Sequence, residues 1–330
     1  MAGIPTMNDV AREARVGLKT VSRFVNGQTN IAPELSDRIA AAIVSIGYRR
    51  NLAAASIRPG WTSKTIGLII SDLANPYYST LTREIERHAR DRGYLLISAS
   101  SDEDGAQHDR LIDRLMEQRI DALIVVPPRD AARDWTAVPP PIPPLVFLDR
   151  PIDFAPADVI LADNEGGAHN AVAELIRHGA RKIAFVGDAL SIYTMSERYA
   201  GYLRALGEAR ITVDPAIVST AAHGSDEAST AVTRLMGDGS IDAVFAANNR
   251  ASIGSIEAFR AVGARIPLIG FDDFEAAKLI TPAVSIVSQD VQEMGRLAAQ
   301  LVLDRLAGEV FEPSLHILPT TLQLRGSELR

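Results

Sequence analysis

Short apolar runs alternate with longer amphipathic segments along most of this chain, from Ile66 to Asp273. Each run is about as long as one buried strand, and most of the segments between runs are long enough for a helix. Runs that are apolar throughout are typical of parallel strands covered on both faces, so the alternation predicts a doubly wound parallel α/β sheet. The runs are IGLII (66–70), YLLIS (94–98), DALIVV (121–126), LVFLD (145–149), KIAFVG (182–187), AVFAAN (243–248) and PLIGFDD (267–273).

The composition excludes several classes of protein. The 330 residues include no cysteine, so disulfide scaffolds, zinc–cysteine sites, cysteine nucleophiles and iron–sulfur clusters are excluded. The first dozen residues carry charge and lack an apolar core of signal-peptide length, and the apolar runs are far shorter than the roughly 20 residues that span a bilayer. We therefore expect a cytoplasmic protein with no membrane segment.

Positive charge is concentrated at the amino-terminal end. Residues 1–60 hold eight Lys and Arg against four Asp and Glu, a balance of +4, so the remainder carries −11 to reach the total of −7. This asymmetry favours a polyanion-binding head joined to an acidic body. Chance clustering of four surplus charges would give the same balance.

The head has the pattern of a helix-turn-helix. Thr6 and Asp9 form a capping box that predicts a short helix through Ala14. A second helical segment covers 18–26, and a third begins at Pro33 and ends at Gly47. Helical spacing in the second segment predicts that Leu18, Val21 and Val25 pack against the first helix and that Lys19, Thr20 and Arg23 face outward.

Residues 7–58 resemble the DNA-binding head and hinge of the lactose/galactose-repressor (LacI/GalR) family of bacterial transcription regulators. The blocks TVSRFVNG (20–27) and IGYRRN (46–51) carry the resemblance. It implies that the second helix lies in the major groove, with Leu18, Lys19 and Arg23 at base edges. These side chains suit that role, since arginine can bond a guanine bidentately, lysine can donate to guanine or phosphate, and leucine can contact a thymine methyl. Thr20, Ser22 and Asn26 suit donors that position phosphates.

The resemblance also implies a hinge helix at 51–58 that orders on operator DNA and inserts an apolar wedge into the minor groove. Ile57 stands at the wedge position, where the family usually has leucine, Arg50 replaces a usual proline, and Gly17 replaces a usual serine cap. Arg50, Asn51 and Ile57 are therefore expected DNA contacts. Alternatively, Ile57 is a linker residue that packs on the body.

Beyond the hinge, the chain resembles the effector-binding body of the same family, which is similar to periplasmic sugar-binding proteins. We expect a helix-turn-helix domain at 1–50, a hinge helix and linker at 51–61, and an effector-binding and dimerisation domain at 62–330. The body should form two lobes of doubly wound sheet. Lobe 1 is expected at about 62–162 plus 290–319, and lobe 2 at about 163–289 plus 320–330.

Polar side chains follow the predicted strands at their carboxyl ends, where such sheets bind ligands. The residues expected to bind the effector are Asp72, Asn75, Tyr77, Tyr78, Asp149, Arg150, Arg198, His223, Asn248, Asp272 and Gln289. By the resemblance, these match sugar-binding positions. Carboxylates, guanidinium groups and amides can together saturate sugar hydroxyls, and tyrosine rings suit the C–H faces of a sugar. A nucleobase would want fewer carboxylates.

Alternative roles remain for some of these residues. Asp272 and Asp273 could cap the following helix, and His223 could be a surface-loop histidine. Asn249 stands where the family commonly has aspartate, so we expect it behind the site rather than in it.

An oxidoreductase or a sugar-processing enzyme would also suit a doubly wound sheet with carboxylates in a cleft. However, the sequence lacks the GxGxxG, GxxxxGK[ST] and GxSxG patterns, and its histidines lack metal-ligand spacing. A freestanding sugar-binding protein would not carry the basic head. We therefore expect no enzyme, cofactor or metal, but a repressor in the bacterial nucleoid that binds double-stranded operator DNA. We expect it to be a homodimer controlled by a small effector. We do not expect a tetramer, because no heptad repeat near the carboxyl end predicts a coiled coil.

Overall fold

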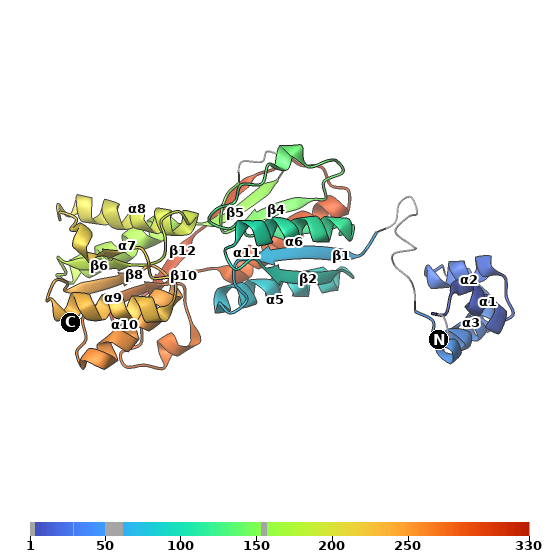
Figure 1. Cartoon of the computed structure of the whole chain (residues 1–330), viewed down its shortest axis with the longest axis horizontal. Coiled ribbons are helices and arrows are strands. Elements are labelled where there is room, and N and C mark those ends of the chain that lie inside the picture. The colour runs from blue at the N-terminus through green and yellow to red at the C-terminus, as the bar shows by residue number, and fades with distance from the viewer. Residues whose placement is uncertain (1–3, 29, 50–61, 153–156, 330) are drawn as a thin grey trace. The chain divides into compact units, whose positions relative to one another are not determined.

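The computed structural model describes residues 4–28, 30–49, 62–152 and 157–329. Its contacts divide the chain after Ser63 into an amino-terminal unit and a larger body (Figure 1). Each unit is compact by itself. Within the described ranges, no helix has both the length and the apolar character needed to cross a membrane.

The amino-terminal unit is a bundle of α1 (Met7–Glu13), α2 (Leu18–Val25) and α3 (Pro33–Ile46). The predicted capping box begins α1, where the Thr6 backbone N–H donates to Asp9 Oδ2 at 2.9 Å and the Thr6 hydroxyl accepts from the Asp9 N–H at 3.4 Å. Gly47 ends α3 in the left-handed conformation, with φ +66°. The bundle buries Val10, Ala14, Val21, Ile39 and Ala42 in one apolar core.

One packing prediction in this unit is wrong. Val21 is fully buried and Val25 is partly buried against the core, but Leu18 is 45% exposed. Leu18 is the first residue of α2, so its side chain lies beyond the edge of the small interface with α1. An exposed leucine in this position agrees better with the expected contact to a thymine methyl than with a core role.

The body contains two sheets, each the centre of one lobe. The first sheet is parallel, with the order β11 (Leu315–Leu318), β5 (Asp158–Ala162), β4 (Leu145–Leu148), β3 (Ala122–Val125), β1 (Thr65–Ile70) and β2 (Leu95–Ser100). The second has the order β12 (Thr320–Gln323), β10 (Ser285–Gln289), β9 (Leu268–Phe271), β8 (Ala243–Ala246), β6 (Ile183–Val186) and β7 (Val218–Ser219). Only β12 is antiparallel to its neighbour among these described strands. The predicted doubly wound architecture is confirmed.

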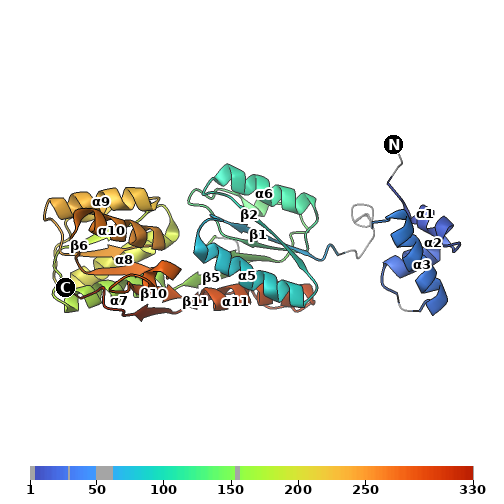
Figure 2. The ribbon, with the colours of Figure 1, turned by 90° about the horizontal axis from the view of Figure 1, so that it is seen from below.

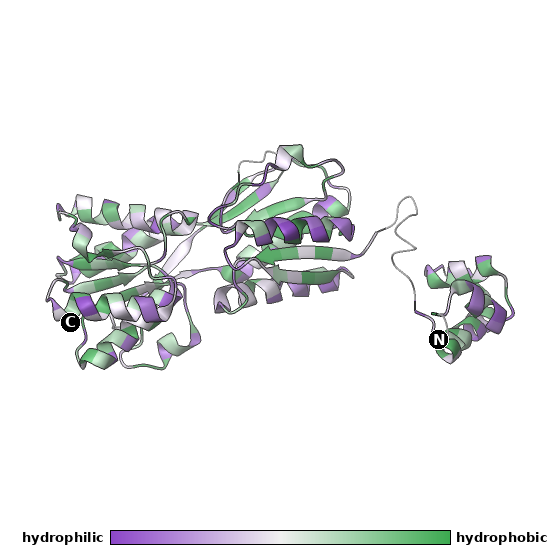
Figure 3. Cartoon of the chain, in the orientation of Figure 1, coloured by the Kyte–Doolittle hydropathy of each residue, from purple (hydrophilic) through white to green (hydrophobic). Residues whose placement is uncertain are grey.

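Helices cover both faces of each sheet (Figures 1 and 2). In the first lobe, α5 (Pro76–Asp91) and α11 (Val291–Leu306) pack on one face, and α6 (Gly105–Glu117) packs on the other. In the second lobe, α7 (Asn164–Arg177) and α8 (Tyr193–Glu208) lie opposite α9 (Ser225–Gly237) and α10 (Asn249–Val262). The inner strands β3, β4, β6, β8 and β9 are apolar along their length and buried on both faces, whereas the edge strands β2, β11 and β12 are partly exposed (Figure 3).

The chain crosses between the lobes at the edge strands. It passes from β5 into α7 near Asp163, returns from β10 into α11 near Asp290, and crosses again from β11 to β12 at Pro319. Short 3-10 helices complete the body at Trp135–Ala137, Pro215–Ile217 and Glu275–Lys278. The proline-rich segment 138–144 contains no helix or strand and leads directly into β4.

We predict that Gly201→Ala destabilises the second lobe. A Cβ atom at Gly201 would lie 2.2 Å from the Glu165 carbonyl oxygen, so α8 would have to move away from α7. Such overpacking costs about 1–3 kcal/mol, which lowers the midpoint of thermal unfolding by several degrees. Circular dichroism would measure this change.

Gly207→Ala is the matched control in the same helix, because a Cβ there would meet no atom within 4 Å. Alanine is the better helix former by roughly 1 kcal/mol, so this variant should unfold at the same temperature as the wild type or higher. Equal losses in both variants would contradict the close helix contact.

Candidate functional site

The recognition surface predicted in the head is exposed by α2. Leu18 and Lys19 are exposed, while Thr20, Ser22 and Arg23 are half-buried. Gly17 is the N-cap of α2 and makes no side-chain cap bond, as its lack of a side chain requires. Asn26 donates its side-chain amide to the Ser22 carbonyl at 2.6 Å and thereby closes the end of the helix. The other expected contacts, Arg50, Asn51 and Ile57, lie outside the described residues.

The Arg23 guanidinium is held by the turn that follows α2. Arg23 Nε donates to Gln28 Oε1 at 2.9 Å, and Nη2 donates to the Asn30 carbonyl oxygen at 2.9 Å and to Asn30 Oδ1. Sequence reasoning did not find Gln28 or Asn30, because no helical or strand periodicity relates them to Arg23. One edge of the guanidinium is therefore already bonded to protein.

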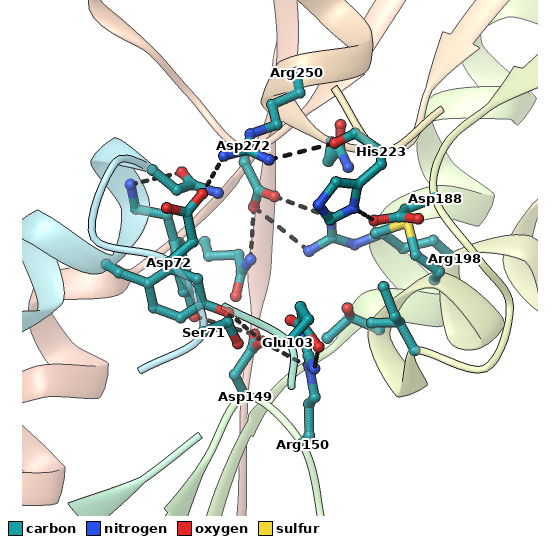
Figure 4. A pocket seen from close by; sticks show the side chains of 18 of the residues that line it. Ser71, Asp72, Glu103, Asp149, Arg150, Asp188, Arg198, His223, Arg250 and Asp272 are labelled. Atoms are coloured by element: carbon teal, nitrogen blue, oxygen red, sulfur yellow. Dashed lines mark hydrogen bonds and ion pairs between the residues drawn. The ribbon is translucent and has the colours of Figure 1, made fainter. Parts of the chain in front are cut away.

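In the body, a cavity of about 300 Å³ lies between the lobes (Figure 4). The structure gathers all the residues predicted to bind the effector around it: Asp72, Asn75, Tyr77, Tyr78, Asp149, Arg150, Arg198, His223, Asn248, Asp272 and Gln289. Sequence reasoning missed Ser71, Asp102, Glu103, Asp188, Ile192, Thr194, Met195 and Arg250. Asp188 follows β6 closely, so the strand-end rule could have found it, whereas Arg250 lies within α10 and has no such signal.

The same position in the two sheets supplies the central carboxylates. Asp149 follows β4 and Asp272 follows β9, which are the corresponding strands of the two lobes. Both residues are left-handed, with φ +66° and +68°, and each donates its backbone N–H at 2.9 Å to the next strand, at Ile160 and Val287. Asp tolerates this conformation better than most residues with a side chain, and strain of this kind is often found at functional sites.

In the first lobe, two tyrosines surround Asp149. Tyr77 donates its hydroxyl to Asp149 Oδ1 at 3.2 Å, and Tyr78 donates to Oδ2 at 3.4 Å. Burial raises the pKa of Asp149 above its usual value, although Arg150 opposes the shift, and burial beside Asp149 raises the pKa of both tyrosines. The tyrosines meet edge to face, with ring centroids 4.9 Å apart. Their hydroxyls therefore belong to the polar network of the cavity.

Arg150 is paired with a carboxylate that the sequence did not point to. Its Nη1 and Nη2 atoms donate to Glu103 at 2.8 and 2.6 Å, and Nη1 also donates to the Pro127 carbonyl at 2.9 Å. Burial alone would raise the pKa of Glu103, but the bonds from Arg150 more than offset it and lower that pKa. Glu103 in turn raises the pKa of Arg150, against the effect of burial.

In the second lobe, Arg198 is the centre of an equivalent network. Its Nη1 atom donates to Asp272 Oδ2 at 2.9 Å, and its guanidinium lies 3.7 Å from the centre of the Phe271 ring. Gln289 Nε2 donates to Asp272 Oδ1 at 2.6 Å. Arg198 also donates to Asn164 Oδ1 at 2.8 Å, so this buried arginine fixes the wall of the cavity. Asp272 is thus bonded to side chains and does not cap a helix.

Two polar contacts join the lobes at the cavity. Arg250 pairs with Asp72 (Figure 4), and Asn249 donates its side-chain amide to Asn75 Oδ1 at 2.9 Å. Asn75 is also the N-cap of α5, and Asn248 is the N-cap of α10, so both have a structural role as well as a place in the cavity wall.

The contacts of His223 and Asp273 bear on the alternatives. His223 lies in a loop with its side chain 57% exposed, as a surface-loop histidine would, and it also lines the cavity with its Nδ1 atom 2.7 Å from Asp188 Oδ2. The Asp273 carboxylate forms an ion pair with Arg325 at 2.7 Å and accepts a hydrogen bond from the Phe274 N–H at 3.0 Å. Asp273 does not line the cavity.

Known protein families match both the amino-terminal unit and the body. Residues 6–51 match the family described as bacterial regulatory proteins, lacI family, and residues 172–328 match a periplasmic binding protein-like domain. The chain is 31% identical over 340 aligned positions to the HTH-type transcriptional regulator CelR of Thermobifida fusca, and the match covers 98% of each protein.

Solved structures show the same fold. The complex of the transcriptional regulator CelR with cellobiose is 28% identical, has a TM-score of 0.70, and covers 98% of this chain and 99% of that one. The lac repressor dimer bound to operator and an anti-inducer is 22% identical, with a TM-score of 0.81 over 99% of this chain and 100% of that one. The relatives are transcriptional regulators rather than enzymes, and this chain belongs to the LacI/GalR family of bacterial transcription regulators.

Proposed function

We propose that the protein is a repressor that binds operator DNA sequence-specifically. Its affinity for this DNA rises or falls when a small ligand binds in the cavity between the lobes. The observation that carries the proposal is the presence, in one chain, of a helix that exposes Leu18 and Lys19 beside a half-buried Arg23, and of a polar cavity with contacts between the two lobes at its edge. A ligand that binds differently to open and closed lobes shifts their equilibrium, and linkage requires DNA and ligand to affect one another equally.

A monosaccharide or a sugar derivative is the ligand class that the cavity supports best. Its volume of about 300 Å³ is at the small end of ligand pockets, and its lining alternates carboxylates, guanidinium groups and amides. Such groups pair with hydroxyls, which each donate and accept. The relative solved with cellobiose bound supports a carbohydrate.

The proposed organisation assigns residues 1–50 to the DNA reader, 51–61 to a hinge and 62–330 to the ligand-binding and dimerisation body. A homodimer follows from the symmetry of pseudo-palindromic operators, in which two half-sites face two heads. Because the reader must meet chromosomal DNA, we place the protein in the bacterial cytoplasm at the nucleoid.

The test is a two-step binding measurement on the full chain. Duplexes that bind would first be selected from a pool of random sequence, and their affinity would then be measured with and without each member of a sugar panel. We expect one enriched duplex motif and at least one sugar that changes its affinity by about fivefold or more. Failure to enrich any duplex at low salt would overturn the DNA-binding half, and enrichment without any ligand effect would overturn the switch.

We predict that Arg23→Ala removes sequence preference while leaving the body intact. Loss of the arginine contact to a guanine should weaken binding to the selected duplex by about tenfold to a hundredfold, with little change on random DNA. Fluorescence anisotropy would measure both affinities. The stabilisation of the variant by the active sugar should match that of the wild type, and a parallel loss of sugar binding would contradict two separable sites.

We predict that Asp149→Asn stabilises the ligand-free protein at neutral pH. The raised pKa of Asp149 means that the folded state favours the protonated carboxyl, so this residue costs stability once the pH rises through that pKa. Asparagine keeps the shape and tolerates φ +66°. The variant should therefore unfold at a higher temperature than the wild type at pH 7, and the difference should shrink towards pH 4. A gain that is independent of pH would contradict this origin.

A further inference from the structure

The cavity holds more acids than bases. Among the described residues that line it, the acidic ones are Asp72, Asp102, Glu103, Asp149, Asp188 and Asp272, and the arginines are Arg150, Arg198 and Arg250. Each arginine is paired with one of these acids, Arg150 with Glu103 at 2.6 Å, Arg198 with Asp272 at 2.9 Å, and Arg250 with Asp72. The positive charge of the lining is therefore already neutralised by protein carboxylates.

Some buried polar atoms at the cavity have no partner in the described structure. Gln289 Oε1 is one, and Gln289 lines the cavity with only 8% of its surface exposed. Arg150 Nε, a donor, is another, but it lies 3.7 Å from Asp149 Oδ2 and so already faces a carboxylate. Gln289 Oε1 is a hydrogen-bond acceptor, so it calls for a ligand that brings a donor.

We propose, building on the function above, that the effector is an uncharged polyhydroxyl compound and that the cavity rejects phosphorylated and carboxylated sugars. A neutral hydroxyl can donate to Gln289 Oε1 or to Asp149 without adding charge. A phosphate or carboxylate would instead add negative charge to a lining with six acidic side chains, in which each guanidinium is already paired with one of them. A like charge about 6 Å away lowers affinity by roughly a hundredfold in a partly buried site.

The test compares matched pairs of compounds on the full chain by thermal shift, at constant ionic strength. Suitable sets are glucose with glucose 6-phosphate and gluconate, galactose with galactose 1-phosphate, and ribose with ribose 5-phosphate. We expect the neutral member of a set to raise the unfolding temperature and its anionic partners to bind at least a hundredfold more weakly. An anionic member that binds as tightly as its neutral partner overturns the proposal.

Inorganic phosphate gives a second arm that needs no known effector. It should not stabilise the wild type beyond a chloride control, whereas Glu103→Gln or Asp72→Asn, which release Arg150 or Arg250, should gain stabilisation by phosphate. Asp72→Asn is less disruptive to folding than Glu103→Gln, because the Asp72 side chain is 25% exposed and that of Glu103 is 9% exposed. If phosphate stabilised the wild type and both variants equally, the proposal that the cavity rejects anions would be overturned.

If no sugar of the panel stabilised the protein but phosphate behaved as expected, a sugar effector would be contradicted while the rejection of anions would still hold.

A separate observation concerns the head. The bonds from Gln28 and Asn30 occupy the Nε and Nη2 side of the Arg23 guanidinium. Nη2 already donates to both oxygens of Asn30, so Nη1, which has no partner among the described residues, remains to donate to guanine O6 or N7. We infer that Gln28 and Asn30 are positioning residues that hold Arg23 ready for a guanine.

This second inference predicts that Gln28→Ala and Asn30→Ala weaken one base preference selectively. In selections from random duplex DNA, each variant should enrich the wild-type motif with the preference for one guanine reduced by about tenfold, and affinity for non-specific DNA should stay the same. Gln28→Glu, which keeps an acceptor for Nε, should restore the preference for that guanine, apart from a general loss of affinity through its charge. An unchanged or stronger guanine preference in the alanine variants would show that these contacts do not position Arg23.

Discussion

Compensation of buried charge is the constraint on which the cleft between the lobes depends. Asp149 and Asp272 lie where two sheets end, and neither can be removed from water at low cost unless a cation or a hydrogen-bond donor accompanies it. Arg198 satisfies Asp272, while Asp149 relies on tyrosine hydroxyls and on Arg150, which is itself bound to Glu103. Burial raises the pKa of Asp149, and the neighbouring arginines and the Tyr77 hydroxyl do not fully offset this shift.

The cavity has this form because the two lobes share one strand order. The two sheets have the same strand order, and β4 and β9 end in the same left-handed aspartate with the same backbone bond. A parallel sheet presents its functional side chains at the carboxyl ends of its strands, so two such edges that face each other enclose a polar space. The arginine partners differ between the lobes, because Arg150 follows its aspartate in sequence whereas Arg198 comes from α8.

Sequence patterns predicted most of the strands and the cavity residues that directly follow them, because burial on both faces leaves a continuous apolar run and the residues after a run lie at the ligand edge. Arg198 lies within α8 and was expected from the family resemblance. They did not reveal Glu103 or Arg250, which enter the cavity only through contacts between distant segments. Helical spacing also assigned Leu18 to the core, because periodicity identifies a face but not where the interface ends. The short strand β7 is too brief to leave a run at all.

The contacts between the lobes bear on how a ligand can act. Arg250 with Asp72 and Asn249 with Asn75 join the two lobes directly, so this arrangement of the lobes has favourable contacts of its own. A ligand changes the balance between open and closed lobes only by the difference between its affinities for them. Since Asp72 and Arg250 also line the cavity, a ligand that bonds to either residue competes with the bridge while it adds contacts elsewhere. The size of the switch is therefore the difference of two terms, and a modest change at the bridge can alter its amplitude without altering the residues that recognise DNA.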